Sequence, residues 1–305
     1  MIIKPRYQTL ELKTMRSLKT RKELSVKEET YYLNLEKGYQ GEQMFDLWIN
    51  ELSDDYLILH DLLFESNHTV FQIDTLLISK ETIYLFEVKN FDKDYYTEDN
   101  KWYTINKTEI KNPLLQLIRN ESLFRRLLQD IGYNSTVEST LIFINPNFFL
   151  YQAPLNIPAI FSTQLERFQK KLNSKPSKLN DRHIRFAEKL LSISLEESPY
   201  SRLPSYSYEQ LTKGITCRFC HSFVSDFNER RVKCHECECE EELQTAIIRC
   251  VEEYITLFST RRITTNSIHE WCKGIVCKKT IQRVLGRKYK LLKHGRSSYY
   301  VNNTD

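Results

Sequence analysis

The chain has 305 residues, of which 41% are hydrophobic and 28% are charged, and its formal net charge is +4. Such a length predicts two or three domains with buried cores, and such a small net charge is by itself a weak argument for a nucleic-acid partner. The sequence contains no stretch as long as a membrane span, and its polar start differs from a secretory signal. We therefore expect a cytoplasmic protein without membrane contact.

Residues 1–30 mix basic and acidic side chains with a loose helical pattern of apolar ones. The apolar positions are Leu10, Leu12, Met15, Leu18 and Leu24. We predict an N-terminal arm that packs on the protein or remains a solvated helix, with a basic contact surface as the alternative.

An amphipathic helix is predicted to follow Gly41. Its inward stripe consists of apolar residues at helical spacing, namely Phe45, Trp48, Ile49 and Leu52. Glu42 lies three residues before Phe45 and therefore on that inward stripe. A carboxylate on a buried face suggests a functional site. The alternative is a first-turn glutamate that the helix dipole favours.

A strand at residues 56–63 is predicted to precede an antiparallel hairpin at residues 69–89. Asp74 lies in the first hairpin strand, and Glu87 and Lys89 lie two residues apart in the second, so the last two leave the same face. Buried charges need a partner or a metal. Two carboxylates and a lysine could hold a hard divalent cation and position a water beside it. The alternative is a structural salt-bridge cluster at a sheet edge.

A short strand near residues 101–105 precedes a helix predicted at residues 112–131. Asn112 is a suitable N-cap, and Pro113 suits the first helical position. The inward residues of this helix are predicted to be Leu114, Leu117, Phe124, Leu128 and Ile131.

Four short motifs in this part of the chain resemble the nuclease-related domain, NERD, a family of the PD-(D/E)xK nuclease superfamily. They are Gly38-x-x-Gly41-Glu42, Gln72-Ile73-Asp74, Phe86-Glu87-Val88-Lys89 and Asn112-Pro113-Leu114-Leu115-Gln116-Leu117. The resemblance covers roughly residues 35–150, and it departs from the family pattern where Gln-Ile, and no proline, precedes Asp74.

The resemblance implies a metal-dependent nuclease. Asp74, Glu87 and the Val88 carbonyl would bind Mg²⁺ or Mn²⁺, and Lys89 would orient the attacking water or stabilise charge in the transition state. Glu42 would bind a second metal or anchor the metal-bound water. Gln116 would position the water or a phosphate.

The core is predicted to continue with a strand at residues 137–144, an aromatic turn at 145–150, a strand at 157–160, and helices near 163–172 and 181–195. We interpret the turn as a loop that closes the core rather than a base-stacking platform. The last helix is predicted to bury Ile184, Ala187, Leu191 and Leu195. This order predicts an α/β fold over residues 31–197, with a mixed sheet flanked by helices. It matches the restriction-endonuclease-like fold that the resemblance implies.

Residues 198–214 carry two prolines and several serines and are predicted to be a linker. Residues 215–240 then contain two C-x-x-C pairs, formed by Cys217 and Cys220 and by Cys234 and Cys237. All eight cysteines lie between Cys217 and Cys277, which favours reduced thiols and a metal over disulfides. The spacing predicts a structural zinc ribbon. Alternative candidates for the fourth ligand are His221, His235 and Cys239.

Residues 241–305 are predicted to form three helices and a hairpin, which resemble a winged helix-turn-helix domain. Thr265 or Asn266 is predicted to cap the second helix, and the hairpin is predicted at residues 289–301. From Arg261 onward, eleven Lys and Arg residues stand against two acids. Such an excess is the footprint expected for phosphate contact. The predicted nucleic-acid-binding residues of the third helix are Lys278, Lys279, Gln282, Arg283 and Arg287.

The predicted function is therefore that of a Mg²⁺- or Mn²⁺-dependent deoxyribonuclease that also contains a structural Zn²⁺. DNA is the expected partner, and RNA and a homo-oligomer are both compatible with the sequence. The alternatives are a nucleic-acid-binding regulator whose nuclease fold is inactive, and a scaffold whose winged helix contacts protein.

Overall fold

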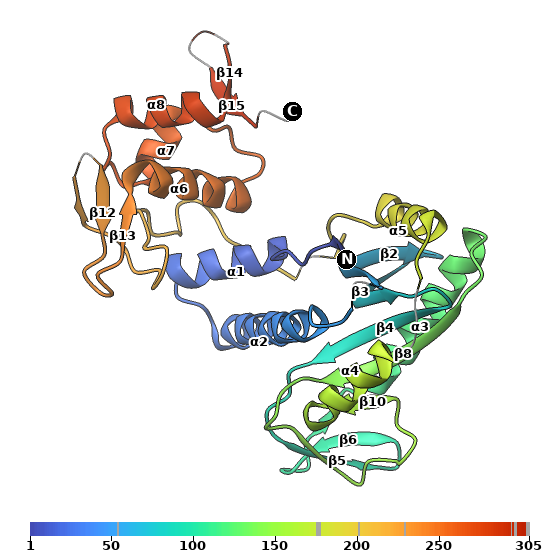
Figure 1. Ribbon diagram of the computed structural model, residues 1–305. Coiled ribbons are helices and arrows are strands. Elements are labelled where there is room, and N and C mark those ends of the chain that lie inside the picture. The colour runs from blue at the N-terminus through green and yellow to red at the C-terminus, as the bar shows by residue number, and fades with distance from the viewer. Residues whose placement is uncertain are drawn as a thin grey trace. The chain divides into compact units, whose positions relative to one another are not determined.

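The computed structural model describes residues 1–53, 55–174, 178–200, 202–228, 230–293, 295 and 298–302. The chain divides into two compact units (Figure 1). The sheet unit comprises Met1–Gln8 and Leu33–Tyr200, and the cysteine unit comprises Thr9–Tyr32 and Ser201–Asp305. The chain therefore passes three times from one unit to the other. None of the helices in the described ranges combines the length and the hydropathy needed to cross a bilayer.

The sheet unit is built on a six-stranded mixed sheet with the order β1-β2-β3-β4-β8-β10. The strands are β1 (Ile2–Lys4), β2 (Leu57–Ser66), β3 (Thr69–Ile78), β4 (Thr82–Lys89), β8 (Thr136–Phe143) and β10 (Ala159–Phe161). β2, β3 and β4 pair antiparallel, whereas β1 with β2, β4 with β8, and β8 with β10 are parallel pairs. The predicted hairpin is confirmed, with Thr75 opposite Phe86 and Ile78 opposite Ile83.

Helices cover both faces of this sheet. They are α2 (Val26–Ile49), α3 (Pro113–Asp130), α4 (Leu165–Asn173), which a 3₁₀ turn (Ser162–Gln164) precedes, and α5 (Asp181–Ile193). Alternate residues of β2 enter two separate cores, because successive strand side chains point to opposite faces. One core contains α3 and α5 residues such as Phe124 and Phe186, and the other contains α2 and α4 residues such as Phe45 and Leu172. The predicted mixed sheet flanked by helices is confirmed.

The helix that carries Glu42 is longer than predicted. α2 begins at Val26, so the predicted start after Gly41 is wrong, and Glu42 is an interior residue rather than a first-turn residue. The helix runs through Gly38, where an added Cβ would meet nothing within 4 Å. At Gly41 an added Cβ would lie 2.4 Å from the Cβ of Asn90, directly after β4. This glycine therefore permits the close packing that brings α2 to the end of β4.

A second, smaller sheet has the order β7-β6-β5-β9. Its strands are β5 (Asp94–Glu98), β6 (Lys101–Thr104), β7 (Glu109–Ile110) and β9 (Phe149–Tyr151). The sequence predicts only β6 of these, because β7 and β9 have two and three residues and are too short to show a period, and β5, with the sequence DYYTE, buries none of its side chains. Phe148 is buried with its ring centroid 4.1 Å from that of Phe143, so the aromatic turn closes the core as expected.

α5 buries a different stripe from the predicted one. Ile184 is 37% exposed, and the buried residues are His183, Phe186, Ala187 and Leu190. The backbone N–H of Asn180, the N-cap, donates to His183 Nδ1 at 3.1 Å. The inward face of α5 thus includes a polar residue, His183. A pattern of apolar residues alone assigns Ile184, one position later, to that face instead.

The cysteine unit contains a three-stranded sheet, four helices and a hairpin among its described residues. They are α1 (Leu10–Arg21), β11 (Asp226–Phe227), β12 (Arg231–Lys233), β13 (Glu240–Glu242), α6 (Leu243–Leu257), α7 (Thr265–Trp271), α8 (Lys278–Lys288), β14 (Lys290–Leu292) and β15 (Tyr299–Val301). The cap of α7 is Thr264, one residue before the predicted Thr265. The predicted hairpin turn includes His294, which lies outside the described residues.

A buried arginine anchors α1 in the cysteine unit. Arg21 donates from Nε to Glu253 Oε1 at 2.8 Å and from Nη1 to the carbonyl of Thr212 at 2.6 Å. Its guanidinium carbon lies 4.1 Å from the ring centroid of Trp271. These contacts join α1 to α6 and α7, although Arg21 and Glu253 are 232 residues apart in the sequence. The apolar stripe of α1, which includes Leu12, Met15 and Leu18, is buried.

Candidate functional site

Two acidic side chains lie where the hydrogen-bonded ladder between β3 and β4 ends. The last paired residues there are Thr75 and Phe86. Beyond them, the backbone N–H of Val88 donates to Asp74 Oδ2 at 2.8 Å, so a carboxylate replaces the next backbone acceptor. Asp74 is 7% exposed and Glu87 is 1% exposed. Both carboxylates are therefore held by the strands themselves and are shielded from water.

Lys89 and α3 surround the carboxylate of Glu87. Lys89 Nζ donates to Glu87 Oε1 at 2.7 Å and to Gln116 Oε1 at 3.1 Å. Gln116 Nε2 donates to the same Glu87 oxygen at 2.5 Å. The Asn112 side chain accepts from the backbone N–H of Leu114 at 2.9 Å and so starts α3 in the register that faces Gln116 toward Glu87.

Asn120, which is not among the residues predicted from the sequence, holds the other oxygen of Glu87. Its Nδ2 donates to Glu87 Oε2 at 3.2 Å and to the carbonyl of Gln72 at 2.9 Å. Asn120 is four residues after Gln116, so both amides leave the same face of α3. A second amide one turn after Gln116 is the signal that could have revealed it.

Burial and mutual repulsion raise the pKa values of these acids. Burial, followed by the charge of Asp74, raises the pKa of Glu87 to about 7. Burial likewise raises the pKa of Asp74, although Lys89 and the Val88 N–H oppose this effect. Burial alone would lower the pKa of Lys89, but the charges of Glu87 and Asp74 outweigh it and raise that pKa. The ammonium of Lys89 is therefore held in its charged form.

Glu42 approaches the same region from α2, but its direct partner is an arginine. Arg6 Nη1 donates to Glu42 Oε2 at 2.7 Å, and Arg6 Nε donates to Asp46 Oδ2 at 2.9 Å. Burial, followed by the charge of Asp74, raises the pKa of Glu42 to about 8. Arg6 is not among the predicted site residues, because it lies in the segment predicted to be an N-terminal arm and carries no local pattern.

The charges of the site fit a divalent cation. Four carboxylates, those of Glu42, Asp46, Asp74 and Glu87, stand against two cations, Arg6 and Lys89. With all six groups ionised, the formal charge is therefore −2. Asp74 and Glu87 supply the hard oxygen ligands that Mg²⁺ and Mn²⁺ prefer. The N–H of Val88 contacts Asp74, and the metal-binding role predicted for its carbonyl stays a prediction.

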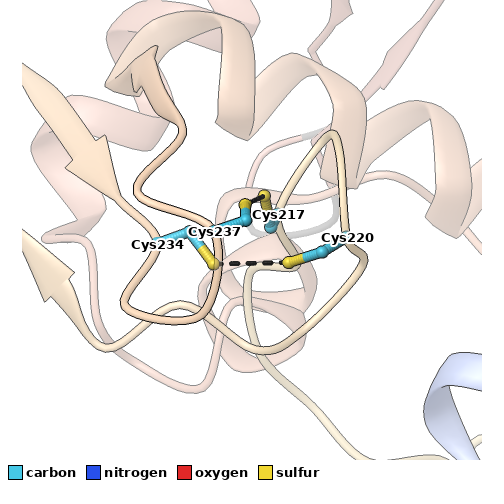
Figure 2. A group of neighbouring side chains, drawn as sticks. All are labelled: Cys217, Cys220, Cys234 and Cys237. Carbon is cyan, nitrogen blue, oxygen red and sulfur yellow. Dashed lines mark hydrogen bonds between the residues drawn. The ribbon is translucent and has the colours of Figure 1, made fainter.

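The four cysteines predicted as zinc ligands point toward one another (Figure 2). Their sulfur atoms all lie within 4.8 Å of one another. The sulfurs of Cys217 and Cys237 are 3.6 Å apart, and those of Cys220 and Cys234 are 3.4 Å apart. A tetrahedral site with Zn–S bonds of about 2.3 Å requires sulfurs about 3.8 Å apart. The geometry fits a closed metal site.

The positions of the sulfur atoms decide between the candidates for the fourth ligand of the cysteine site. Among the described residues, these four cysteines form the one group of three or more potential ligands that are this close together. His221, His235 and Cys239 are not members of it. Cys239 has a separate partner, since Arg218 Nε lies 3.4 Å from its sulfur. The predicted set of four cysteines is therefore the set that the structure brings together.

The residues predicted to bind nucleic acid lie on one helix and are exposed. Lys278, Lys279, Gln282, Arg283 and Arg287 all belong to α8, whose buried residues are Ile281, Val284 and Leu285. Arg287 Nη1 donates to Gln244 Oε1 on α6 at 3.0 Å. The predicted outward face of α8 is confirmed, whereas its binding role stays a prediction.

Comparison with known proteins identifies one part of the chain. No curated protein and no solved structure matches the sequence. A family model, described as the nuclease-related domain, matches residues 37–144. The matched stretch includes Glu42, Asp74, Glu87, Lys89 and Gln116. This protein therefore contains a nuclease-related domain, which provides the central strands of its sheet unit.

Proposed function

We propose that this protein is a cytoplasmic, metal-dependent nuclease that hydrolyses phosphodiester bonds in DNA. The observation that carries the proposal is the group formed by Asp74, Glu87, Lys89 and Gln116 at the end of the β3–β4 ladder, inside the matched domain. Two buried carboxylates beside a lysine are an arrangement that can hold a metal ion next to a phosphate.

Each residue of the group has a distinct proposed role. Asp74 and Glu87 would hold Mg²⁺ or Mn²⁺, which when bound polarises the scissile phosphate and lowers the pKa of a bound water. Gln116 and Asn120 fix the orientation of the Glu87 carboxylate through 2.5 Å and 3.2 Å hydrogen bonds. Lys89, which is 20% exposed at its side chain, would stabilise the negative charge that develops on the phosphate.

The cysteine unit would supply DNA affinity. We infer that the four cysteines hold a structural Zn²⁺, because four protein thiolates leave no open coordination position. We also infer that α6, α7, α8 and the β14–β15 hairpin act as a winged helix that contacts DNA. The exposed cations of α8 support this inference, because phosphate contacts from Lys and Arg dominate DNA affinity.

Nuclease activity is tested by incubating the protein with circular single-stranded DNA, circular double-stranded DNA and RNA. Each substrate is tested with Mg²⁺, with Mn²⁺ and with EDTA. Cleavage is expected with metal and not with EDTA, and Asp74→Asn, Glu87→Gln and Lys89→Ala should each abolish it. Glu65→Gln, at an exposed site on β2, is the matched control and should cleave like the wild type. No cleavage of any substrate with either metal would refute the proposal.

Thermal melting separates this proposal from a structural ion-pair cluster. A metal site made of mutually repelling acids predicts that Asp74→Asn melts at or above the wild-type temperature in EDTA, and that Mn²⁺ raises only the wild-type melting temperature. A structural cluster predicts that the same variant loses roughly 3–5 kcal/mol of stability, because a buried charge is left unpaired. A destabilised variant and no Mn²⁺ response in either protein would favour the inactive alternative.

A further inference from the structure

The N-terminal arginine occupies an unusual position beside the candidate site. Arg6 follows β1, and its side chain is only 3% exposed. Its Nη2 donates to the carbonyl of Asp74 at 2.8 Å and to Thr75 Oγ1 at 3.1 Å. The same guanidinium pairs with Glu42 and makes two hydrogen bonds to Asp46, at 2.9 Å and 3.1 Å. One buried cation thus joins two acids of α2 to the backbone of the strand that carries Asp74.

These contacts separate the four acids of the site into two pairs. Glu42 and Asp46 both pair with Arg6. Burial alone would lower the pKa of Arg6, but the charges of Glu42 and Asp46 outweigh it and raise that pKa, so the guanidinium stays charged. Lys89 pairs with Glu87 and also lowers the pKa of Asp74, on which the charge of Arg6 has a smaller effect of the same sign. In agreement with this division, no three of the four acids have oxygens within 4.8 Å of one another in the described structure.

We propose that Arg6 is a built-in cation that stands where a second metal ion would otherwise bind, so that this site takes a single divalent cation, held by Asp74 and Glu87. The proposal rests on the proposed nuclease function, and it replaces the metal-binding role predicted for Glu42. Glu42 and Asp46 serve instead as the anchor for Arg6. Arg6 acts as a positioning residue, because it holds the β3 backbone at Asp74 while it occupies these two carboxylates.

The stoichiometry of Mn²⁺ binding tests this directly. Mn²⁺ is added to the full chain, which keeps its cysteine-bound zinc, and free Mn²⁺ is counted by electron paramagnetic resonance. The wild type should bind one Mn²⁺. Arg6→Gln should bind two, because Glu42 and Asp46 become available, and Arg6→Lys should bind one, because the positive charge is kept. A second wild-type Mn²⁺, or a single Mn²⁺ in Arg6→Gln, would overturn the proposal, and so would no binding by the wild type.

A second set of variants keeps the proposal testable if Arg6→Gln does not fold. Asp74→Asn should weaken Mn²⁺ binding by about 100-fold or more, because loss of a direct ligand should exceed the roughly 10–100-fold cost of replacing a residue that only hydrogen-bonds a ligand. Glu42→Gln should leave the Mn²⁺ affinity within about threefold of the wild type, which is a smaller loss than replacement of such a hydrogen-bonding residue typically causes. A Glu42→Gln loss as large as that of Asp74→Asn would make Glu42 a metal ligand and overturn the inference.

Failure of this inference differs from failure of the proposed function. One bound Mn²⁺ without cleavage of any substrate would refute the nuclease and leave the role of Arg6 intact. Cleavage with two bound Mn²⁺ ions would support the nuclease and refute the role of Arg6.

Discussion

His60 is a buried histidine whose ring nitrogen has two neighbours. Its Nδ1 lies 3.1 Å from Thr75 Oγ1 and 3.1 Å from Asp46 Oδ1, and the side chain is 2% exposed. Burial lowers its pKa to about 4, although the charge of Asp46 opposes this effect and those of Arg6 and Lys4 reinforce it. The folded protein therefore keeps this ring neutral at pH values at which the unfolded chain protonates it.

This difference predicts a loss of stability in acid. Between pH 6.5 and about pH 4 the unfolded chain binds a proton that the folded chain rejects, so the free energy of unfolding falls as the pH falls. We expect His60→Gln to remove roughly 2 to 3 kcal/mol of this dependence between about pH 7.5 and pH 4.5. Denaturant unfolding of both proteins across this pH range measures the difference.

The matched control for that experiment is His68→Gln. His68 lies in the turn between β2 and β3, and its side chain is fully exposed. Because its replacement removes no buried group, it reports what the loss of an exposed histidine alone does to the same profile. Parallel pH profiles for the wild type and His60→Gln would contradict the assigned role of His60.

At the residue scale, the sequence predicts the parts of the site that follow a local period. Glu87 and Lys89 share a strand face, and Gln116 follows an N-cap and a proline, so their convergence can be predicted. Arg6 reaches the site only because β1 pairs with β2, 55 residues away in the sequence. Such a partner is set by tertiary pairing and has no counterpart in a local pattern.

The two cysteine knuckles form an element that we expect to depend on a bound metal. The close approach of four thiolates is unfavourable without a cation, so we expect zinc binding and local folding to be coupled. Replacing Cys217 and Cys220 with serine should release about one zinc per chain and disorder residues 215–240. The sheet unit should stay folded, since it contains no cysteine. Zinc analysis and circular dichroism measure the two effects.

Cys239→Ser is the control for the zinc experiment. Cys239 lies two residues after Cys237 but outside the four-sulfur group. Its replacement should therefore leave the zinc content at that of the wild type. Retention of stoichiometric zinc by the double variant would disprove the assignment of the site.

The outward face of α8 is predicted to contact phosphates. Lys278, Lys279 and Arg283 are exposed there. Their joint replacement by alanine should weaken DNA binding alike for all sequences. It should also reduce the dependence of log K on log salt by about 2 to 3 units, since each phosphate contact contributes about 0.9. Titration of labelled DNA at several salt concentrations measures this slope.

Lys288 provides a control within the same helix. Its ammonium already pairs with Glu252 on α6, so Lys288→Ala should change the slope less than the triple variant does. An unchanged affinity and slope in the triple variant would leave protein contact as the better interpretation of this surface.

At the scale of elements, the sequence predicts long periodic segments well and short ones poorly. β3, β4, α3 and β8 lie within one or two residues of their predicted positions. The predicted start of α2 is wrong because Gly38 and Gly41 resemble a helix break. In the structure the helix tolerates Gly38 and needs Gly41 for close packing. The second sheet is largely missed because its strands are stabilised by neighbours rather than by their own pattern.

The whole molecule consists of two units with interleaved sequences. Residues 9–32 pack with residues 201–305, although the entire nuclease-related domain lies between them. A fragment of residues 201–305 would therefore lack the buried partner of Glu253 and the apolar stripe of α1. We expect this fragment alone to melt at a lower temperature than its mixture with a peptide of residues 9–32.

The anchoring arginine provides the control for this complementation. A peptide that carries Arg21→Ala loses the ion pair with Glu253 and the contact with the Trp271 ring. It should raise the melting temperature of the fragment less than the wild-type peptide does. Identical melting with and without either peptide would show that α1 does not stabilise the cysteine unit.

The separation of Arg21 from Glu253 also orders events during synthesis. The two residues are 232 positions apart. At roughly 5–20 residues per second, α1 leaves the ribosome about 10–50 s before its partners on α6 and α7. Throughout that interval Leu12, Met15 and Leu18 lack the surface that buries them in the finished protein. Although α1 is translated before α6 and α7, it can pack only after they are made, and until then its apolar stripe is a target for a chaperone.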